Sequence, residues 1–163
     1  MAQLLQLKED REYDSLISNL NQVLAPFKDY QDIPSNLTRY RALLMELYFL
    51  TKEYDQALAY ASQLASDGGD DLALIENAQT YQALSLIESG RSDEAQVLMD
   101  QLGWLGDLRA DSNPKQLYLG AKLMSVKGEY SQAMELIAYV IAFNSQDTEW
   151  MQPAELLLSL IHI

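Results

Sequence analysis

The sequence predicts an all-α chain built from repeated antiparallel helix pairs, and three observations support this fold class. The first is a repeat in which Ala57, Ala95 and Ala133 are evenly spaced along the chain. The second is that apolar residues recur at helical spacing on both sides of each repeated motif. The third is that no stretch alternates apolar and polar residues between hairpin turns, as strands would. We therefore expect stacked helices and no sheet.

Three hexapeptides align without gaps and define the repeat; they occupy 52–57, 90–95 and 128–133. A weaker fourth copy, over 11–16, lies slightly more than one period before its neighbour. A period of about 38 residues is typical of helical units that stack to share a core. We predict a single domain over 1–163. Its repeats are expected over 1–26, 36–66, 71–103 and 113–144, with a partial repeat over 148–163.

Each predicted repeat contains a helix, a short turn, a second helix and a longer loop. The first helix of one repeat is expected over 72–88, where apolar residues recur every three or four positions. Gly90 and Gly128 suit the left-handed backbone conformation that ends such a helix. The loops between repeats are expected at 67–71, 111–114 and 144–147, which are rich in Asp, Asn, Ser and Gly.

The composition limits the classes of partner. The chain has 163 residues, with 24 acidic and 11 basic side chains and a net charge of -13. A general nucleic-acid binder needs clustered Lys and Arg, so we expect no nucleic acid and no anionic membrane surface as partner. No apolar run approaches the roughly 20 residues of a membrane span. The partner is therefore expected to be a protein or a peptide.

The compartment stays open. The chain has no cysteine, so no disulfide framework indicates an oxidising environment. Its first residues lack the basic and long apolar regions of a signal peptide, which favours the cytoplasm. A periplasmic location remains an alternative if a leader has been removed.

No catalytic constellation is found in the sequence. His162 is the only histidine, and it lies next to the last position given, so neither a Ser/His/Asp triad nor a histidine metal cage is expected. The acidic loop over 67–71 lacks the order of an EF-hand, and we interpret it as an inter-repeat loop with a helix N-cap. We expect no enzyme activity, no catalytic residue, no cofactor and no metal site.

The repeated motif resembles the tetratricopeptide repeat family. The junction pattern Gly-x-Tyr-x-x-Ala is complete in 128–133, and the family's small residue seven positions before the junction glycine is matched by Ala83 and Ala121. Two features depart from the family, namely Met45 at the small position and the absence of its usual Trp. Arg41, Gln79 and Leu117 stand where that Trp is expected. The resemblance implies a right-handed α-solenoid, a superhelix whose first helices line a concave groove.

The family's ligand-facing positions map onto three first helices of this chain. The candidate partner-binding residues are Arg39, Glu46, Asn77, Tyr81, Leu84, Lys115, Tyr118 and Lys122, with Ala42 and Leu43 between the first two. Lys115, Tyr118 and Lys122 share one helix face, where two cations beside an aromatic ring would hold a peptide carboxylate. The alternative is an ordinary solvated face with a half-buried Tyr. Because Ala42 and Glu46 replace the Lys and Asn of the family's chaperone-tail clamp, that ligand is not expected.

Three functions remain open from the sequence. The leading hypothesis is a scaffold or adaptor that binds a peptide or protein segment in the groove. The first alternative is an acidic secretion-type chaperone that holds an apolar client segment. The second is a structural segment of a larger envelope or scaffold assembly, joined to its neighbours or to further copies through the helix over 156–163. Separately, if that terminal helix is an exposed half repeat, the chain should self-associate in solution, and Leu157→Glu or Leu160→Glu should weaken the self-association.

Overall fold

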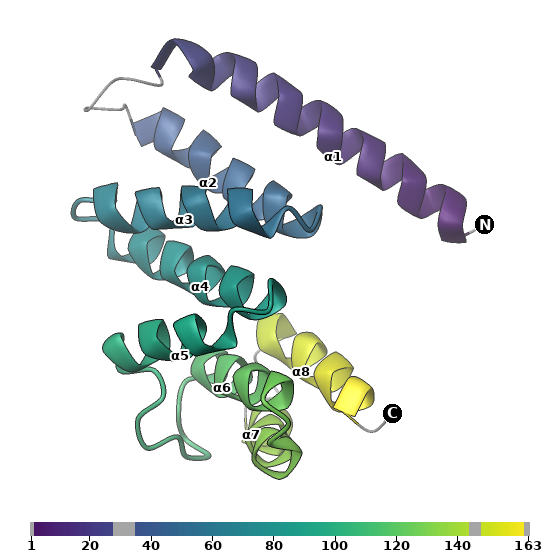
Figure 1. The fold of residues 1–163 in the computed structure, drawn as a ribbon, viewed down its shortest axis with the longest axis vertical. Helices are drawn as coiled ribbons and strands as arrows, with labels where there is room; N and C mark the ends of the chain where they lie inside the picture. The colour runs from purple at the N-terminus through teal and green to yellow at the C-terminus, as the bar shows by residue number, and fades with distance from the viewer. Residues whose placement is uncertain (1, 28–34, 144–147, 162–163) are drawn as a thin grey trace. The chain divides into compact units, whose positions relative to one another are not determined.

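The computed structural model describes residues 2–27, 35–143 and 148–161, and the regular structure within these ranges is entirely helical. This confirms the predicted all-α class. The helices are α1 (Ala2–Leu24), the short 3-10 helix η1 (Ala25–Phe27), α2 (Ser35–Leu50), α3 (Tyr54–Asp67), α4 (Leu72–Glu88), α5 (Ser92–Gln101), α6 (Pro114–Val126), α7 (Tyr130–Phe143) and α8 (Thr148–Ile161) (Figure 1).

The helix boundaries repeat with the period of the sequence. The ends of α2, α4 and α6 are evenly spaced by one period, and so are the starts of α3, α5 and α7. In each turn the residue at 52, 90 or 128 has a positive φ, of 63°, 81° and 83° respectively. The N–H of the next residue then donates to a carbonyl five positions earlier, at 2.8–2.9 Å. This is the Schellman ending of a helix, which satisfies carbonyls that the helix leaves open.

The first of these turns closes without a glycine. Lys52 has the left-handed conformation, which costs a side-chain-bearing residue about 1–2 kcal/mol. The neighbouring Thr51 hydroxyl donates to the carbonyls of Leu47 and Tyr48, at 3.0 and 3.2 Å. The Glu53 N–H also donates to the Tyr48 carbonyl. These hydrogen bonds hold the end of α2 in the form that glycine gives to α4 and α6.

The weak fourth copy of the motif does not form a turn. Residues 11–16 lie inside α1, which runs without interruption from Ala2 to Leu24. The reason is the apolar pattern beyond the motif, because Ile17, Leu20 and Leu24 continue at helical spacing and are all buried. The predicted repeat over 1–26 is therefore one long helix followed by η1, and not a helix pair.

The chain divides into two compact units, Met1–Ser85 and Leu86–Ile163, and the division falls inside α4. In the first unit, α1 packs on α2 and α2 packs on α3 (Figure 1). One apolar cluster joins Ile17, Leu20 and Leu24 of α1 to Leu44 and Leu47 of α2, with Leu37 also in it. A second cluster joins Met45 of α2, Ala61 and Leu64 of α3, and Ala78 of α4. These clusters fix α2 in the middle of the unit.

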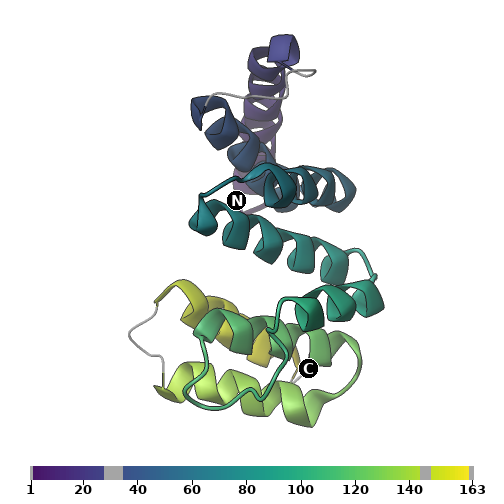
Figure 2. The ribbon, with the colours of Figure 1, turned by 90° about the vertical axis from the view of Figure 1, so that its left-hand side faces the viewer.

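The second unit has its own buried core. α6 packs on α7, and α8 packs on both (Figure 2). Leu117, Leu123, Ile137 and Val140 are fully buried, as is Ala154 of α8. The α6 start is fixed by Asn113, whose side chain accepts from the Lys115 N–H at 2.9 Å, with Pro114 in the first turn.

The last helix exposes a pair of leucines. Leu156 and Leu160 are 63% and 59% exposed, whereas Leu157 is only 9% exposed. The two exposed residues are one helical turn apart and so share a face. Leu157 belongs to the packed face, so Leu157→Glu would disrupt the core instead of testing the surface. That part of the sequence-based expectation is corrected here, and Leu160 remains the informative position.

Candidate functional site

The first unit has a pocket of about 480 Å³ beside α2. We name it the acidic pocket. It lies between one face of α2 and the turn that joins α3 to α4. Its lining residues are Thr38, Arg39, Ala42, Leu43, Glu46, Asp67, Gly68, Asp71 and Leu74. The α2 members recur every three or four residues, so a single helix face forms one wall.

The opposite wall depends on a tight turn. The Asp71 side chain accepts from the Leu74 N–H at 3.0 Å and so caps the start of α4, as the sequence predicts for this loop. The Asp71 N–H donates to the Gly68 carbonyl at 3.1 Å. A Cβ on Gly68 would lie 2.5 Å from Ile75 Cγ1 and 2.9 Å from the Leu64 carbonyl oxygen. Glycine at this position therefore lets α3 and α4 approach closely.

The acidic pocket combines negative charge with an apolar patch. Three carboxylates line it, those of Glu46, Asp67 and Asp71, against one guanidinium, that of Arg39. Ala42, Leu43 and Leu74 supply the apolar surface, and Leu43 is 37% exposed. A pocket of this size and lining accepts a side chain with an apolar stem and a cationic head. Arg or Lys in an extended partner segment has both.

The structure brings together two of the five candidate residues predicted in this unit. Arg39 and Glu46 both line the acidic pocket, whereas Asn77, Tyr81 and Leu84 do not. The Tyr81 ring packs edge-on against Phe49, with centroids 5.4 Å apart, and Leu84 is 8% exposed. Leu84 is therefore buried and Tyr81 partly buried against the apolar cluster, because α4 turns this apolar stripe inward.

The three candidates of the second unit form a cluster that is largely buried. Tyr118 is 9% exposed, and its ring lies 5.5 Å from that of Trp150. The Lys122 ammonium lies 5.9 Å from the Tyr118 ring centroid and forms an ion pair with Glu88. The Lys115 ammonium lies 4.9 Å from the ring of Trp104, which is itself buried. Both cations thus contact groups of this chain, and a partner carboxylate would have to displace Glu88 from Lys122.

The protonation of Lys122 reflects this pairing. Burial by itself lowers the pKa of the ammonium, but the neighbouring Tyr118 and Glu88 outweigh it, and the pKa is raised. Lys122 therefore stays charged at neutral pH. Its side chain is 18% exposed, so the charge is stabilised mainly by groups of the protein.

Sequence reasoning missed half of the acidic pocket. Thr38 of α2 was not among the candidate residues, and neither were Asp67, Gly68, Asp71 and Leu74, although the loop over 67–71 stood out for its acidity. The acidity of that loop was a usable signal, but its interpretation as a capped turn did not place the loop opposite α2.

Among the residues that the structure describes, no group of three or more His, Asp or Glu side chains has the geometry to hold a metal ion. No helix in these described ranges is long and apolar enough to cross a membrane.

Comparisons with known proteins give no match to a protein-family model, to a curated protein or to a solved structure.

Proposed function

We propose that this protein is a non-enzymatic interaction module that binds a basic segment of a peptide or protein. The contact we assign is the acidic pocket, where Glu46, Asp67 and Asp71 meet the side chain of a partner Lys or Arg. The observation that carries the proposal is the lining itself, three carboxylates beside the exposed Leu43. The tetratricopeptide-like, right-handed stacking of the helix pairs, with the groove that it implies, is part of the proposal.

The chemistry of the acidic pocket favours a charged segment over an apolar client. A chaperone groove for apolar segments would be lined mainly by apolar side chains, whereas this pocket has four charged ones. The net charge of -13 acts in the same direction, since it attracts basic partners and accelerates their encounter at low salt. An adaptor is therefore supported over the secretion-chaperone alternative.

The test uses a displayed library of random dodecapeptides, selected against the whole chain. We expect the selected peptides to contain a Lys or Arg next to an apolar residue. The Glu46→Gln/Asp71→Asn variant should weaken their binding by about tenfold, because two charge-assisted contacts are lost. Asn at 71 keeps an acceptor for the Leu74 N–H, so the cap of α4 is retained.

The matched control is Asp14→Asn/Asp55→Asn, which removes the same net charge from exposed positions outside the acidic pocket. Binding that falls only in the pocket variant supports the assigned contact. An equal loss in both variants indicates general charge attraction and contradicts the pocket. Selection of peptides without basic residues contradicts the proposed partner class.

A second candidate function is self-association through α8. The exposed pair Leu156 and Leu160 favours it, because apolar side chains on one helix face gain by being covered. Sedimentation of the wild type should then show dimers at high concentration that Leu160→Glu abolishes. Leu72→Glu is the control, since Leu72 is 77% exposed but lies on α4. A wild type that stays monomeric at every concentration contradicts this candidate.

A further inference from the structure

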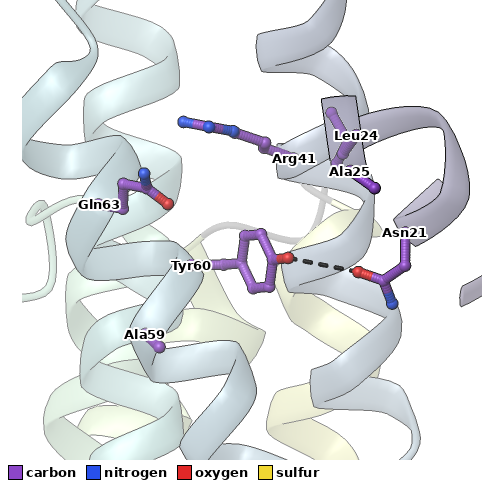
Figure 3. Close-up of a pocket in the computed structure, with 7 residues that line it drawn as sticks. All are labelled: Asn21, Leu24, Ala25, Arg41, Ala59, Tyr60 and Gln63. Carbon is purple, nitrogen blue, oxygen red and sulfur yellow. Dashed lines mark hydrogen bonds between the residues drawn. The ribbon is translucent and has the colours of Figure 1, made fainter. Parts of the chain in front are cut away.

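A second pocket of the first unit shares no residue with the acidic pocket. It has a volume of about 460 Å³ and is formed by α1, η1, α2 and α3 (Figure 3). We name it the arginine pocket. Its lining residues are Asn21, Leu24, Ala25, Arg41, Ala59, Tyr60 and Gln63. Among these described lining residues, Arg41 is the only charged one.

The Arg41 side chain is the unusual feature of this pocket. The residue is 9% exposed, yet within the described part of the chain its guanidinium has neither an ion pair nor a hydrogen bond. Figure 3 shows the side chain extending from α2 across the pocket, on the side where Gln63 lies. A buried charge without a counter-charge is strongly destabilising, so such groups are almost always paired. The pocket in front of Arg41 is where a counter-charge fits.

Neutral polar groups are held in place next to Arg41. The Asn21 amide donates to the Tyr48 hydroxyl at 3.1 Å and accepts from the Tyr60 hydroxyl at 3.5 Å. The rings of Tyr48 and Tyr60 stack with centroids 5.8 Å apart. Burial raises the pKa of the Tyr60 hydroxyl, and Tyr48 adds to this, while Arg41 opposes it. Tyr60 is therefore a neutral hydrogen-bond donor at physiological pH.

We propose that the arginine pocket binds a carboxylate group of a ligand, with the Arg41 guanidinium as its counter-charge. A guanidinium pairs with a planar carboxylate through two parallel hydrogen bonds. Gln63 adds a donor at the rim, and the Tyr60 hydroxyl becomes a second one when its proton turns from Asn21, which it meets at only 3.5 Å, to the ligand. Leu24, Ala25 and Ala59 accept a small aliphatic group beside the carboxylate. A phosphate dianion fits less well, because one cation in a chain of net charge -13 leaves its second charge uncompensated.

The bound carboxylate is either the C-terminus of a peptide or an acidic side chain within a peptide. The inference does not rest on the proposed function, since the two pockets have different residues and opposite charge. A ligand that carries both a carboxylate and a basic segment would use both pockets, but each is tested alone. The arginine-pocket variants leave Glu46 and Asp71 intact.

The experiment titrates the whole chain with four matched peptides by calorimetry. They are acetyl-trialanine with a free carboxylate, the same peptide amidated, and two amidated peptides with a central glutamate or glutamine. We expect one of the two acids to bind at least about tenfold more tightly than its neutral counterpart. Arg41→Met should abolish that difference, and Tyr60→Phe should weaken it while keeping the ring stack. Tighter binding of the peptide with the free C-terminus, or of the peptide with the glutamate, identifies which kind of carboxylate the pocket binds.

A stability measurement on the ligand-free protein makes the inference independent of peptide choice. Because Arg41 is buried with no partner among the described residues, Arg41→Met should raise the thermal midpoint by about 3 °C. Arg41→Met could instead lower the thermal midpoint, and Asp29→Asn/Asp32→Asn could lower it by the same amount. Together these results would show that Arg41 is paired with acids that lie outside the described residues. That result overturns the proposal. Acid binding that survives in Arg41→Met, or binding of inorganic phosphate without either acid, also overturns it.

Discussion

Arg41 in the first unit is a buried cation and Lys122 in the second a partly buried one, each on the first helix of a pair, but their surroundings differ. Lys122 forms an ion pair with Glu88 and lies beside the Tyr118 ring. Arg41 is more deeply buried, and within the described residues no carboxylate lies in contact with its guanidinium. A pocket opens next to Arg41, whereas the protein itself supplies the partner of Lys122.

The difference separates a structural cation from a candidate binding cation. An aromatic neighbour is common to both, since Tyr60 lies beside Arg41 and Tyr118 beside Lys122. What differs is whether the part of the chain that the structure describes already provides the counter-charge. A cation that is neutralised internally contributes to the fold, whereas one left without a partner is available to a ligand.

The largest effect is expected from removing the internal partner of Lys122. Glu88→Gln should destabilise the chain by about 1–2 kcal/mol, because it leaves a mostly buried ammonium without a counter-charge. We place the value below that of a fully buried pair, since the Glu88 side chain is 31% exposed. Urea unfolding measures it, and Lys122→Met combined with Glu88→Gln should restore part of the loss.

The control for this prediction is Glu94→Gln. Glu94 pairs with Arg91 on the surface, with both side chains well exposed, so its loss should destabilise the chain much less than Glu88→Gln does. Equal effects of Glu88→Gln and Glu94→Gln would show that burial does not strengthen the Lys122 pair, and the contrast with Arg41 would lose its basis.

The next effect concerns the turns, which also differ between the units. Gly128→Ala should destabilise by about 1 kcal/mol, because φ is 83° there and the space around the new Cβ is open, so the backbone alone accounts for the loss. Lys52→Gly should instead stabilise by up to about 1 kcal/mol, since it relieves the same conformation. Thermal unfolding measures the change in stability of both variants relative to the wild type. Destabilisation by Lys52→Gly would show that the lysine side chain contributes more than its strain costs.

The smallest effect is a pH dependence. The pKa of Lys122 is raised in the folded chain, so its contribution to stability is complete below the unfolded pKa of about 10.4 and is lost as pH rises through the folded pKa. Stability should therefore fall more steeply above about pH 10 in the wild type than in Lys122→Met. Parallel profiles in alkaline urea titrations would contradict this role of the ion pair.

The local parts of the fold could be predicted from the sequence. Helix ends are set by neighbouring residues, so the repeated motif located the turns at 52, 90 and 128, including the one without glycine. The helix pairs over 35–67, 72–101 and 114–143 differ from the predicted repeats by no more than two residues at any end. The turn predicted from the motif over 11–16 was wrong, because the apolar pattern that continues α1 outweighs a weak likeness to a turn.

The site could be predicted only in part, because its remaining residues meet through tertiary packing. Arg39 and Glu46 share one face of α2 and so follow from helical spacing. The pairing of Lys122 with Glu88 joins two different helices, and no pattern within either helix indicates it. Arg41 was noted only as the replacement for a family Trp. Its burial, with no partner among the described residues, is visible only once α1, α2 and α3 are assembled.

The most direct test of the central claim is to map a selected basic peptide on the ¹⁵N-labelled chain by chemical-shift perturbation. We expect the largest shifts at the amides of Arg39, Leu43, Gly68 and Leu74, which line the acidic pocket from both sides. Amides near the arginine pocket, such as those of Ala59 and Gln63, should move less with a peptide that lacks a carboxylate. Shifts centred on Leu156 and Leu160, or on Tyr118 in the second unit, would contradict the assignment of the partner-binding site.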